Sequence, residues 1–257
     1  MRSYSSRTKR SPRARDTQTI ILSPASRSQA AEGCLVVLGD VDVDTAPRTV
    51  EHIAADRGTA TAVRFDLADT DSVAALLDAA AATYGGVDAV VVVGADMRAI
   101  RADTDVVDID FEVWDRVMTV NLRGYVDTMK YAIPHLLTRG GGTIVNMSSA
   151  AAFQGEAARP AYATAKAGIG ALTRHVASRW GRQRIRCNAV APGFTATEAI
   201  QATPQWPELQ AAALNRIRGP RVGAPGDVAA LVAFLISQDG EWINGQVINI
   251  DGGTVLR

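Results

Sequence analysis

The chain has few cysteines, no excess of charge of either sign and no long apolar run. Its two cysteines, Cys34 and Cys187, are isolated, which favours reduced thiols of a cytoplasmic protein over a disulfide framework or a zinc site. Its 27 basic and 27 acidic residues balance, so no net field attracts nucleic acid or an anionic membrane. No apolar stretch reaches the ~20 residues that span a bilayer, and the three histidines lack metal-ligand spacing. We therefore expect no nucleic-acid, membrane or metal partner.

The N-terminal stretch lacks both acidic residues and apolar periodicity. Residues 1–15, MRSYSSRTKRSPRAR, are rich in arginine and serine, which is typical of a disordered segment. A transit peptide or a nucleic-acid-binding arm shares this composition, whereas a dispensable tail or a misassigned start of translation is the simpler explanation. We divide the chain into a disordered basic tail, residues 1–18, and one domain, residues 19–257.

Short β-branched runs alternate with alanine-rich helical segments from residue 34 onward. Strands are expected at residues 34–38, 60–65, 89–93, 143–146, 184–190 and 246–250. Helices are expected at residues 46–55, 71–84, 111–137, 161–180 and 226–236. Asp71 is the expected N-cap of the second helix, and Pro134 is expected to bend the third. This alternation predicts an α/β fold, a single-domain doubly wound parallel sheet with right-handed crossovers.

Turn residues and polar side chains follow five of these strands. Asp40, Asp66, Gly94, Ser149 and Gly193 each stand within a few residues of an expected strand end. In doubly wound sheets, ligands bind beyond the carboxyl ends of the strands, where the strand order reverses. Strand ends often carry turn residues for structural reasons alone, which accounts for the glycines better than for the polar side chains. The sequence therefore predicts a ligand cleft at this edge.

Tyr162 and Lys166 are four residues apart in the expected helix 161–180, so their side chains share one face. A nearby ammonium favours phenolate and lowers the pKa of a tyrosine from about 10. Such a phenol can exchange a proton with a substrate oxygen. Y-x-x-x-K also occurs by chance on exposed helices, so this interpretation depends on the companions Asn121 and Ser149.

Ordered motifs over roughly residues 32–257 resemble those of the short-chain dehydrogenase/reductase family. They are FDL at 65–67, VNL within WDRVMTVNLRG, GGTIVNMSS ending at Ser149, YATAK at 162–166, IRCNAVAPGFTAT, GAPGDV at 223–228 and GQVINIDGG. Each motif alone is modest evidence, but their order and separations match the family. The resemblance implies a Rossmann-like three-layer sandwich over residues 19–257 and an oxidoreductase activity.

The resemblance implies catalytic roles for four side chains. Tyr162 would be the general acid/base at the reacting oxygen, and Lys166 would lower its pKa and hydrogen-bond the nicotinamide ribose. Ser149 would hold the substrate carbonyl or hydroxyl and stabilise charge that grows on its oxygen. Asn121 would fix a water that links Lys166 to solvent.

The resemblance also implies a site for NAD(H). Asp66 would contact the adenine, and the remaining cofactor contacts would come from Leu67, Gly94, Tyr162, Lys166, Pro192, Gly193, Thr195 and Thr197. Asp40 would accept hydrogen bonds from the adenosine ribose and repel a 2′-phosphate, which favours NAD over NADP. A helix-capping or surface role for Asp40 is the alternative.

The sequence departs from the family at the first glycine turn, T-G-x-x-x-G-x-G. Residues 22–28 align with V-T-G-A-S-R-G, with Pro24 and Ser28 in glycine places. Proline lacks the N–H and cannot adopt the glycine conformation. A first helix of ordinary length, about 11–12 residues, does not fit between Ser28 and Cys34. At the end of the valine strand, Val92 and Val93 replace the two asparagines of N-N-A-G.

Three explanations of the altered turn remain open: a wrong frame or gene start, decayed dinucleotide affinity, and binding through an altered loop. The leading hypothesis is an enzyme that interconverts a secondary alcohol and a ketone with NAD(H). The alternative is a binding or scaffold protein that has lost dinucleotide binding. Residues 151–153 and the loop through Trp206 and Leu209 are expected to line a pocket for a small apolar alcohol or ketone. The resemblance further implies a homotetramer or homodimer.

Overall fold

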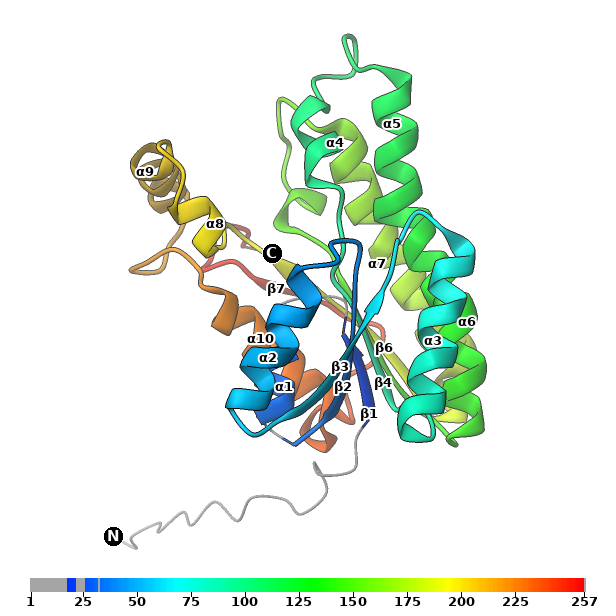
Figure 1. The fold of residues 1–257 in the computed structure, drawn as a ribbon. Coiled ribbons are helices and arrows are strands. Elements are labelled where there is room, and N and C mark those ends of the chain that lie inside the picture. The colour runs from blue at the N-terminus through cyan, green and yellow to red at the C-terminus, as the bar shows by residue number, and fades with distance from the viewer. Residues whose placement is uncertain (1–17, 22–25, 32, 257) are drawn as a thin grey trace, which may run out of the picture.

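The computed structural model describes residues 18–21, 26–31 and 33–256, and Figure 1 shows how they fold. The predicted basic tail at residues 1–18 lies outside this part of the chain except for Gln18. The turn that carries Pro24 lies outside it as well.

Seven parallel strands of the described chain form one sheet in the order β3-β2-β1-β4-β5-β6-β7. They are β1 (Gln18–Ile21), β2 (Leu35–Asp40), β3 (Thr59–Arg64), β4 (Ala89–Val92), β5 (Gly142–Met147), β6 (Ile185–Pro192) and β7 (Val247–Ile250). The order reverses between β1 and β4, which is the switch point of a doubly wound sheet. The predicted fold class is confirmed.

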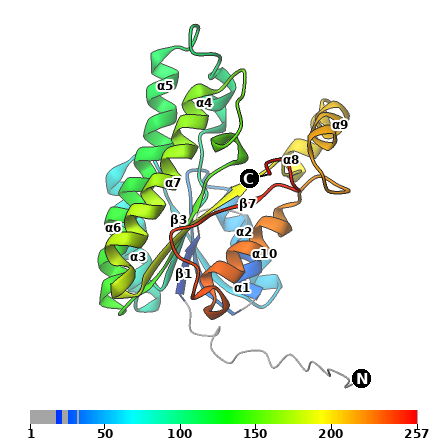
Figure 2. The same cartoon turned by 180° about the vertical axis from the view of Figure 1, so that it is seen from behind.

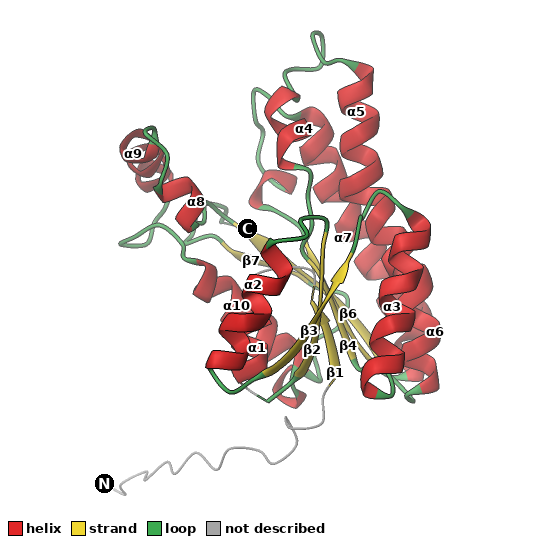
Figure 3. Cartoon of the chain, viewed as in Figure 1, coloured by secondary structure: helices red, strands yellow, loops and turns green. Residues whose placement is uncertain are grey.

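Helices cover both faces of the sheet, as Figures 1 and 2 show from opposite sides. One face carries α1 (Ser26–Ala31), α2 (Thr45–Ala55) and α10 (Pro225–Ile236), and the other carries α3 (Thr70–Tyr84), α6 (Gly124–Thr138) and α7 (Pro160–Trp180). Beyond the carboxyl edge lie α4 (Met97–Ala102), α5 (Phe111–Met118), α8 (Glu198–Gln201) and α9 (Trp206–Arg216). Figure 3 shows the same elements coloured by type.

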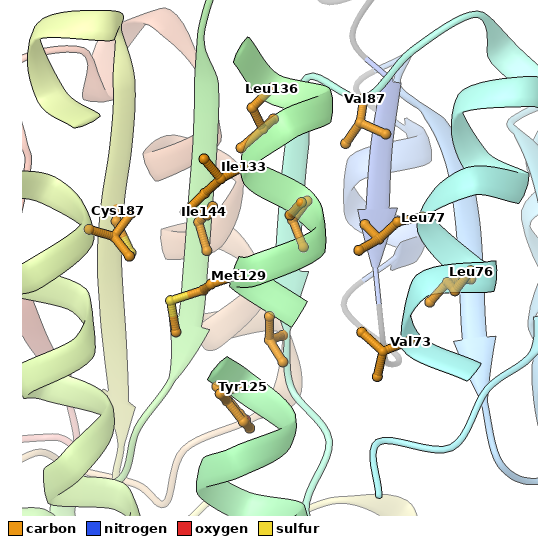
Figure 4. Close-up of a cluster of buried hydrophobic side chains, with 14 of the residues drawn as sticks. Val73, Leu76, Leu77, Val87, Tyr125, Met129, Ile133, Leu136, Ile144 and Cys187 are labelled. Carbon is orange, nitrogen blue, oxygen red and sulfur yellow. The ribbon is translucent and has the colours of Figure 1, made fainter. Parts of the chain in front are cut away.

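A buried apolar cluster joins the sheet to the α3–α6–α7 layer (Figure 4). Leu77 of α3, Leu136 of α6 and Ile144 of β5 are among its members. Every residue of β4 is fully buried, which explains the valine run, since a central parallel strand is covered on both faces. This packing fixes the strand ends that carry the candidate site.

The N-cap of α3 is Asp69, so the prediction of Asp71 is wrong. The Asp69 carboxylate accepts hydrogen bonds from the backbone N–H of Asp71 at 3.0 Å and of Ser72 at 3.4 Å. Its extended backbone, with φ −110° and ψ 109°, suits a cap, whereas Asp71 lies inside the first turn. The helix therefore begins one residue earlier than the pattern indicated.

The expected long helix at residues 111–137 consists of three consecutive segments. A π-helical segment, η2 (Thr119–Arg123), separates α5 from α6, and α6 continues through Pro134. The π-helical hydrogen bonding lies at η2, whereas Pro134, which has no N–H to donate, lies within α6, and the expected bend there stays a prediction. π-segments of this kind are frequent at functional sites, and η2 carries Asn121.

The first helix, α1, has only six residues. The expectation that a helix of ordinary length does not fit before Cys34 is confirmed. The short strand β1, which no apolar pattern singled out, lies between β2 and β4 at the centre of the sheet.

Candidate active site

A cavity of about 640 Å³ opens at the carboxyl edge of the sheet. Its walls come from the segments that follow β5 and β6, from the start of α7 and from α9. In Figure 1, α8 and α9 lie on one side of this edge, and α4 and α7 lie on the other. Seven of the predicted site residues line it, namely Ser149, Tyr162, Lys166, Pro192, Gly193, Thr195 and Thr197.

Ser149 and Tyr162 lie together in this cavity. Ser149 has an extended backbone with φ −162° and caps a short 3-10 helix, since its Oγ accepts the N–H of Ala151 at 3.2 Å. Its side chain is also close enough to the Tyr162 phenol to lower the pKa of that group. Both hydroxyls therefore belong to the same cavity, and their joint role stays a prediction.

A buried carboxylate that sequence reasoning missed holds the start of α7. Asp103, only 3% exposed, accepts the backbone N–H of Tyr162 at 2.8 Å and of Ala161 at 3.3 Å. The backbone N–H of Arg159 in turn donates to the Asp103 and Thr104 carbonyls, at 3.2 and 2.7 Å. The segment after α4 therefore positions the turn that presents the phenol. Asp103 belongs to no motif and lies 59 residues from Tyr162 in the sequence, so it gave no sequence signal for this role.

Burial raises the pKa of Tyr162 above its ordinary value of 10.0. The hydrogen bond from Ser149 and the charge of Arg159 act in the opposite direction, while Glu156 adds to the increase. The guanidinium carbon of Arg159 lies 5.6 Å from the centre of the Tyr162 ring. The phenol is therefore protonated at neutral pH, the form that can donate a proton.

Lys166 is fully enclosed, with 2% of its surface exposed. Its Nζ donates to the Met147 carbonyl at 2.8 Å and to the Tyr125 hydroxyl at 3.3 Å. Burial lowers the pKa of Lys166 from 10.5 to about 7, because neither oxygen carries a compensating charge. The Lys166 Nζ lies 5.8 Å from the centre of the Tyr162 ring, and a lowering of the Tyr162 pKa by this amine stays a prediction.

Tyr125, from α6, completes the surroundings of Lys166. Its ring is fully buried, and its hydroxyl lies 3.1 Å from the Gly94 carbonyl and 3.3 Å from the Met147 carbonyl. The Lys166 Nζ is 5.0 Å from the centre of this ring. Tyr125 thus links the ends of β4 and β5 to the lysine, a contact between distant segments that spacing did not reveal.

Asn121 is completely buried within η2. Its Oδ1 accepts the backbone N–H of Asp96 at 2.9 Å. Its Nδ2 has no hydrogen-bond acceptor among the described residues. A buried amide donor without a protein partner is costly, which fits a group that serves a bound molecule.

Four predicted cofactor contacts lie at neighbouring strand ends but do not line the cavity. Asp40 and Asp66 each accept a backbone N–H two residues ahead, from Asp42 and Ala68, at 2.9 Å. Leu67 is buried in the core, and the Gly94 carbonyl faces the Tyr125 hydroxyl. These residues follow β2, β3 and β4, where a ligand extending along the sheet edge would pass.

Similar proteins support a common family. A family model described as enoyl-(acyl carrier protein) reductase matches residues 23–255. A probable short-chain type dehydrogenase/reductase of Bradyrhizobium diazoefficiens is 43% identical over 232 residues, or 89% of this chain and 81% of that protein. The cis-4-hydroxycyclohexanecarboxylate dehydrogenase of Sinomonas cyclohexanicum is 36% identical over 233 residues, or 89% of both chains. The solved structure of a short-chain type dehydrogenase/reductase from Mycobacterium ulcerans has a TM-score of 0.86 and 26% identity, and the match covers 95% of this chain and 91% of that one.

The chain belongs to the short-chain dehydrogenase/reductase family, whose members are oxidoreductases that use nicotinamide dinucleotides. The family predicted from the motifs is therefore confirmed. Among the described helices, none is both long and apolar enough to cross a membrane.

The residues around the cavity fit the nicotinamide half of such a cofactor. The backbone of Gly193 passes so close to β7 that a Cβ there would lie 2.7 Å from the Cβ of Asp251, which leaves a flat wall beside Pro192. The buried Nδ2 of Asn121, a residue outside the cavity lining, has no acceptor among the described residues. The phosphate-binding turn of the family corresponds to residues 22–28, of which residues 22–25 lie outside the described part of the chain.

Proposed function

We propose that the protein interconverts a secondary alcohol and a ketone with NAD(H), with Tyr162 as general acid/base. The observation that carries this proposal is that Ser149, Tyr162 and Lys166 line one cavity, with Ser149 close enough to the phenol to lower its pKa. The family's activity sets the reaction class, and the two hydroxyls define where the reacting oxygen would sit.

In the direction of ketone reduction, both hydroxyls face the carbonyl oxygen. Tyr162 donates its proton to that oxygen, and Ser149 donates a hydrogen bond that stabilises the charge growing on it. Because burial raises the pKa of Tyr162, the phenol carries its proton at neutral pH. The bound nicotinamide supplies or accepts the hydride. Alcohol oxidation requires the deprotonated tyrosine, which accepts the proton of the substrate hydroxyl and which a higher pH favours, since burial raises the pKa of Tyr162.

The remaining residues would hold the cofactor and exclude water. Lys166 would hydrogen-bond the nicotinamide ribose, while Pro192, Gly193, Thr195 and Thr197 would contact the nicotinamide. Asp40 would select NAD over NADP by repelling a 2′-phosphate at the end of β2. Asp66, Leu67 and Gly94 would flank the adenosine, and Asn121 would fix a water near the lysine.

The substrate would have a compact apolar body. Phe194, Ile200 and Leu209 line the cavity together with Ala151. The name of the Sinomonas relative describes a hydroxyl on a six-membered ring, a body of suitable size for such a wall.

The proposal is tested by following NADH consumption with a panel of cyclic and aliphatic ketones. Tyr162→Phe should lower kcat/KM by about 10²–10⁴-fold, because it removes the transferable proton. Tyr131→Phe, a partly buried tyrosine of α6 outside the cavity, is the matched control. Equal inactivity of wild type and Tyr162→Phe, with normal NADH binding, would refute the assignment.

The alternative is a binding or scaffold protein without dinucleotide affinity. It is favoured by Pro24 in a glycine place and by the six-residue α1. Titration calorimetry with NAD separates the two functions. Binding in the micromolar range supports the enzyme, whereas no heat at millimolar NAD supports the scaffold.

A further inference from the structure

The wall of the cavity carries four charged side chains: Glu156, Arg159, Lys166 and Arg216. Arg159 is paired with Glu156, so these two charges offset each other. Lys166 lies at the inner wall with its own hydrogen-bond acceptors. Arg216 forms no ion pair with any described carboxylate. The cavity therefore has a net positive wall even when Lys166 is neutral.

Arg216 is the last residue of α9, and its Nη2 donates to the Gln154 Oε1 at 2.8 Å. Gln154 stands five residues after Ser149 and also lines the cavity. This charge-assisted hydrogen bond joins the end of α9 to the segment after Ser149, although the Arg216 side chain is exposed. The hydrogen bond to Gln154 uses one of the five N–H donors of the Arg216 guanidinium. Two neighbouring N–H groups of the planar guanidinium therefore remain for another acceptor.

Arg159 places a second guanidinium beside the reacting phenol. It stands directly before α7 in a left-handed conformation with φ 68°, and its guanidinium lies over the Tyr162 ring. Because Glu156 offsets the charge of Arg159, Arg216 is the guanidinium of the cavity wall without a paired carboxylate among the described residues. The intervening wall is apolar and includes Ile200, Leu209 and Ile217.

We propose that the substrate carries a carboxylate, or a similar small anion, at the end of its apolar body away from the reacting oxygen, and that Arg216 binds this anion. Guanidinium and carboxylate match as a bidentate pair, which gives both affinity and orientation. With its acid on Arg216, the substrate directs its alcohol or ketone toward Ser149 and Tyr162. The orientation rests on the proposed function, whereas the anion site itself does not.

The experiment compares matched acids and amides: cyclohexanecarboxylate, benzoate and hexanoate, each against its carboxamide, titrated calorimetrically into the protein with NAD present. Wild type should bind at least one acid about tenfold or more tightly than its amide, the size of one charge-assisted pair. Arg216→Gln should abolish this preference, and Arg216→Lys should restore part of it. Arg218→Gln, two residues further on and outside the cavity lining, should leave it unchanged.

The proposal is overturned if no acid binds more tightly than its amide, or if Arg218→Gln removes the preference as fully as Arg216→Gln. A parallel assay measures NAD reduction by 4-hydroxycyclohexanecarboxylate and by cyclohexanol. An acid preference in binding without any turnover refutes the proposed reaction and leaves the anion site standing. Equal turnover of both alcohols, with no binding preference, refutes the anion site alone.

Discussion

Replacing Lys166 with methionine should remove a pH-dependent cost that the buried lysine imposes on folding. Its ammonium faces only the neutral oxygens of Met147 and Tyr125, and burial lowers its pKa from 10.5 to about 7. The unfolded chain therefore binds more protons than the folded chain between those two pKa values. Stability rises with pH across that window, and the cost is fully present below about pH 7.

The magnitude follows from the pKa difference. One pKa unit corresponds to about 1.4 kcal/mol. A lysine that is half protonated near pH 7 therefore changes the free energy of unfolding by about 1–2 kcal/mol between about pH 7 and about pH 8.5. The free energy of unfolding of wild type should rise by that amount relative to Lys166→Met. This window lies below the ordinary pKa of 9.0 for cysteine and 10.0 for tyrosine, so Cys187 and Tyr162 contribute little to it.

The assay is urea unfolding of the ligand-free protein, followed by circular dichroism at several pH values within the window. Lys130→Met is the matched control, since Lys130 is exposed on α6 and should leave the pH dependence unchanged. If wild type and Lys166→Met show the same change in unfolding free energy with pH, the lysine is not desolvated as described and the reasoning fails.

Two further predictions test the cofactor site and the start of α3. Asp40→Ser should lower the ratio of kcat/KM for NAD over NADP by about tenfold or more, because it removes the charge that repels a 2′-phosphate; Asp44→Ser is the control, and an unchanged ratio would count against Asp40. Asp69→Ala should cost about 0.5–2 kcal/mol of unfolding free energy, since it removes both capping hydrogen bonds. Asp71→Ala should cost less, and the reverse order in thermal or urea unfolding would contradict the assignment of the cap.

Much of the fold was predictable because buried parallel strands consist largely of β-branched residues. The valines of β4 and the apolar residues of β5 indicated central strands. The motifs around Ser149 and Tyr162 indicated two of the residues that line the cavity. In each case a local pattern and a tertiary role coincide. Strand β1 was not predicted because a run of four residues is too short to show a hydrophobic periodicity.

The surroundings of the site were less predictable because they depend on contacts between distant segments. The spacing of Tyr162 and Lys166 indicates a shared helical face, but not that the amine turns toward Met147 and Tyr125. The contribution of Arg216 to the cavity was missed for the same reason. Its place in the lining depends on the position of α9 beside the segment that carries Gln154, and these two segments are far apart in the sequence. The fold brings the residues of a ligand cleft together from distant parts of the chain. Their separation in the sequence therefore does not predict which of them will be in contact.

The hydrogen bonds from α7 to Asp103 couple the reactive tyrosine to the arm formed by α4 and α5. A displacement of that arm would reach the phenol through the Asp103 carboxylate and through the packing of Val117 against Ala161. Altered packing of α4 and α5 can thus change the turnover rate while the side chains that contact the substrate stay the same.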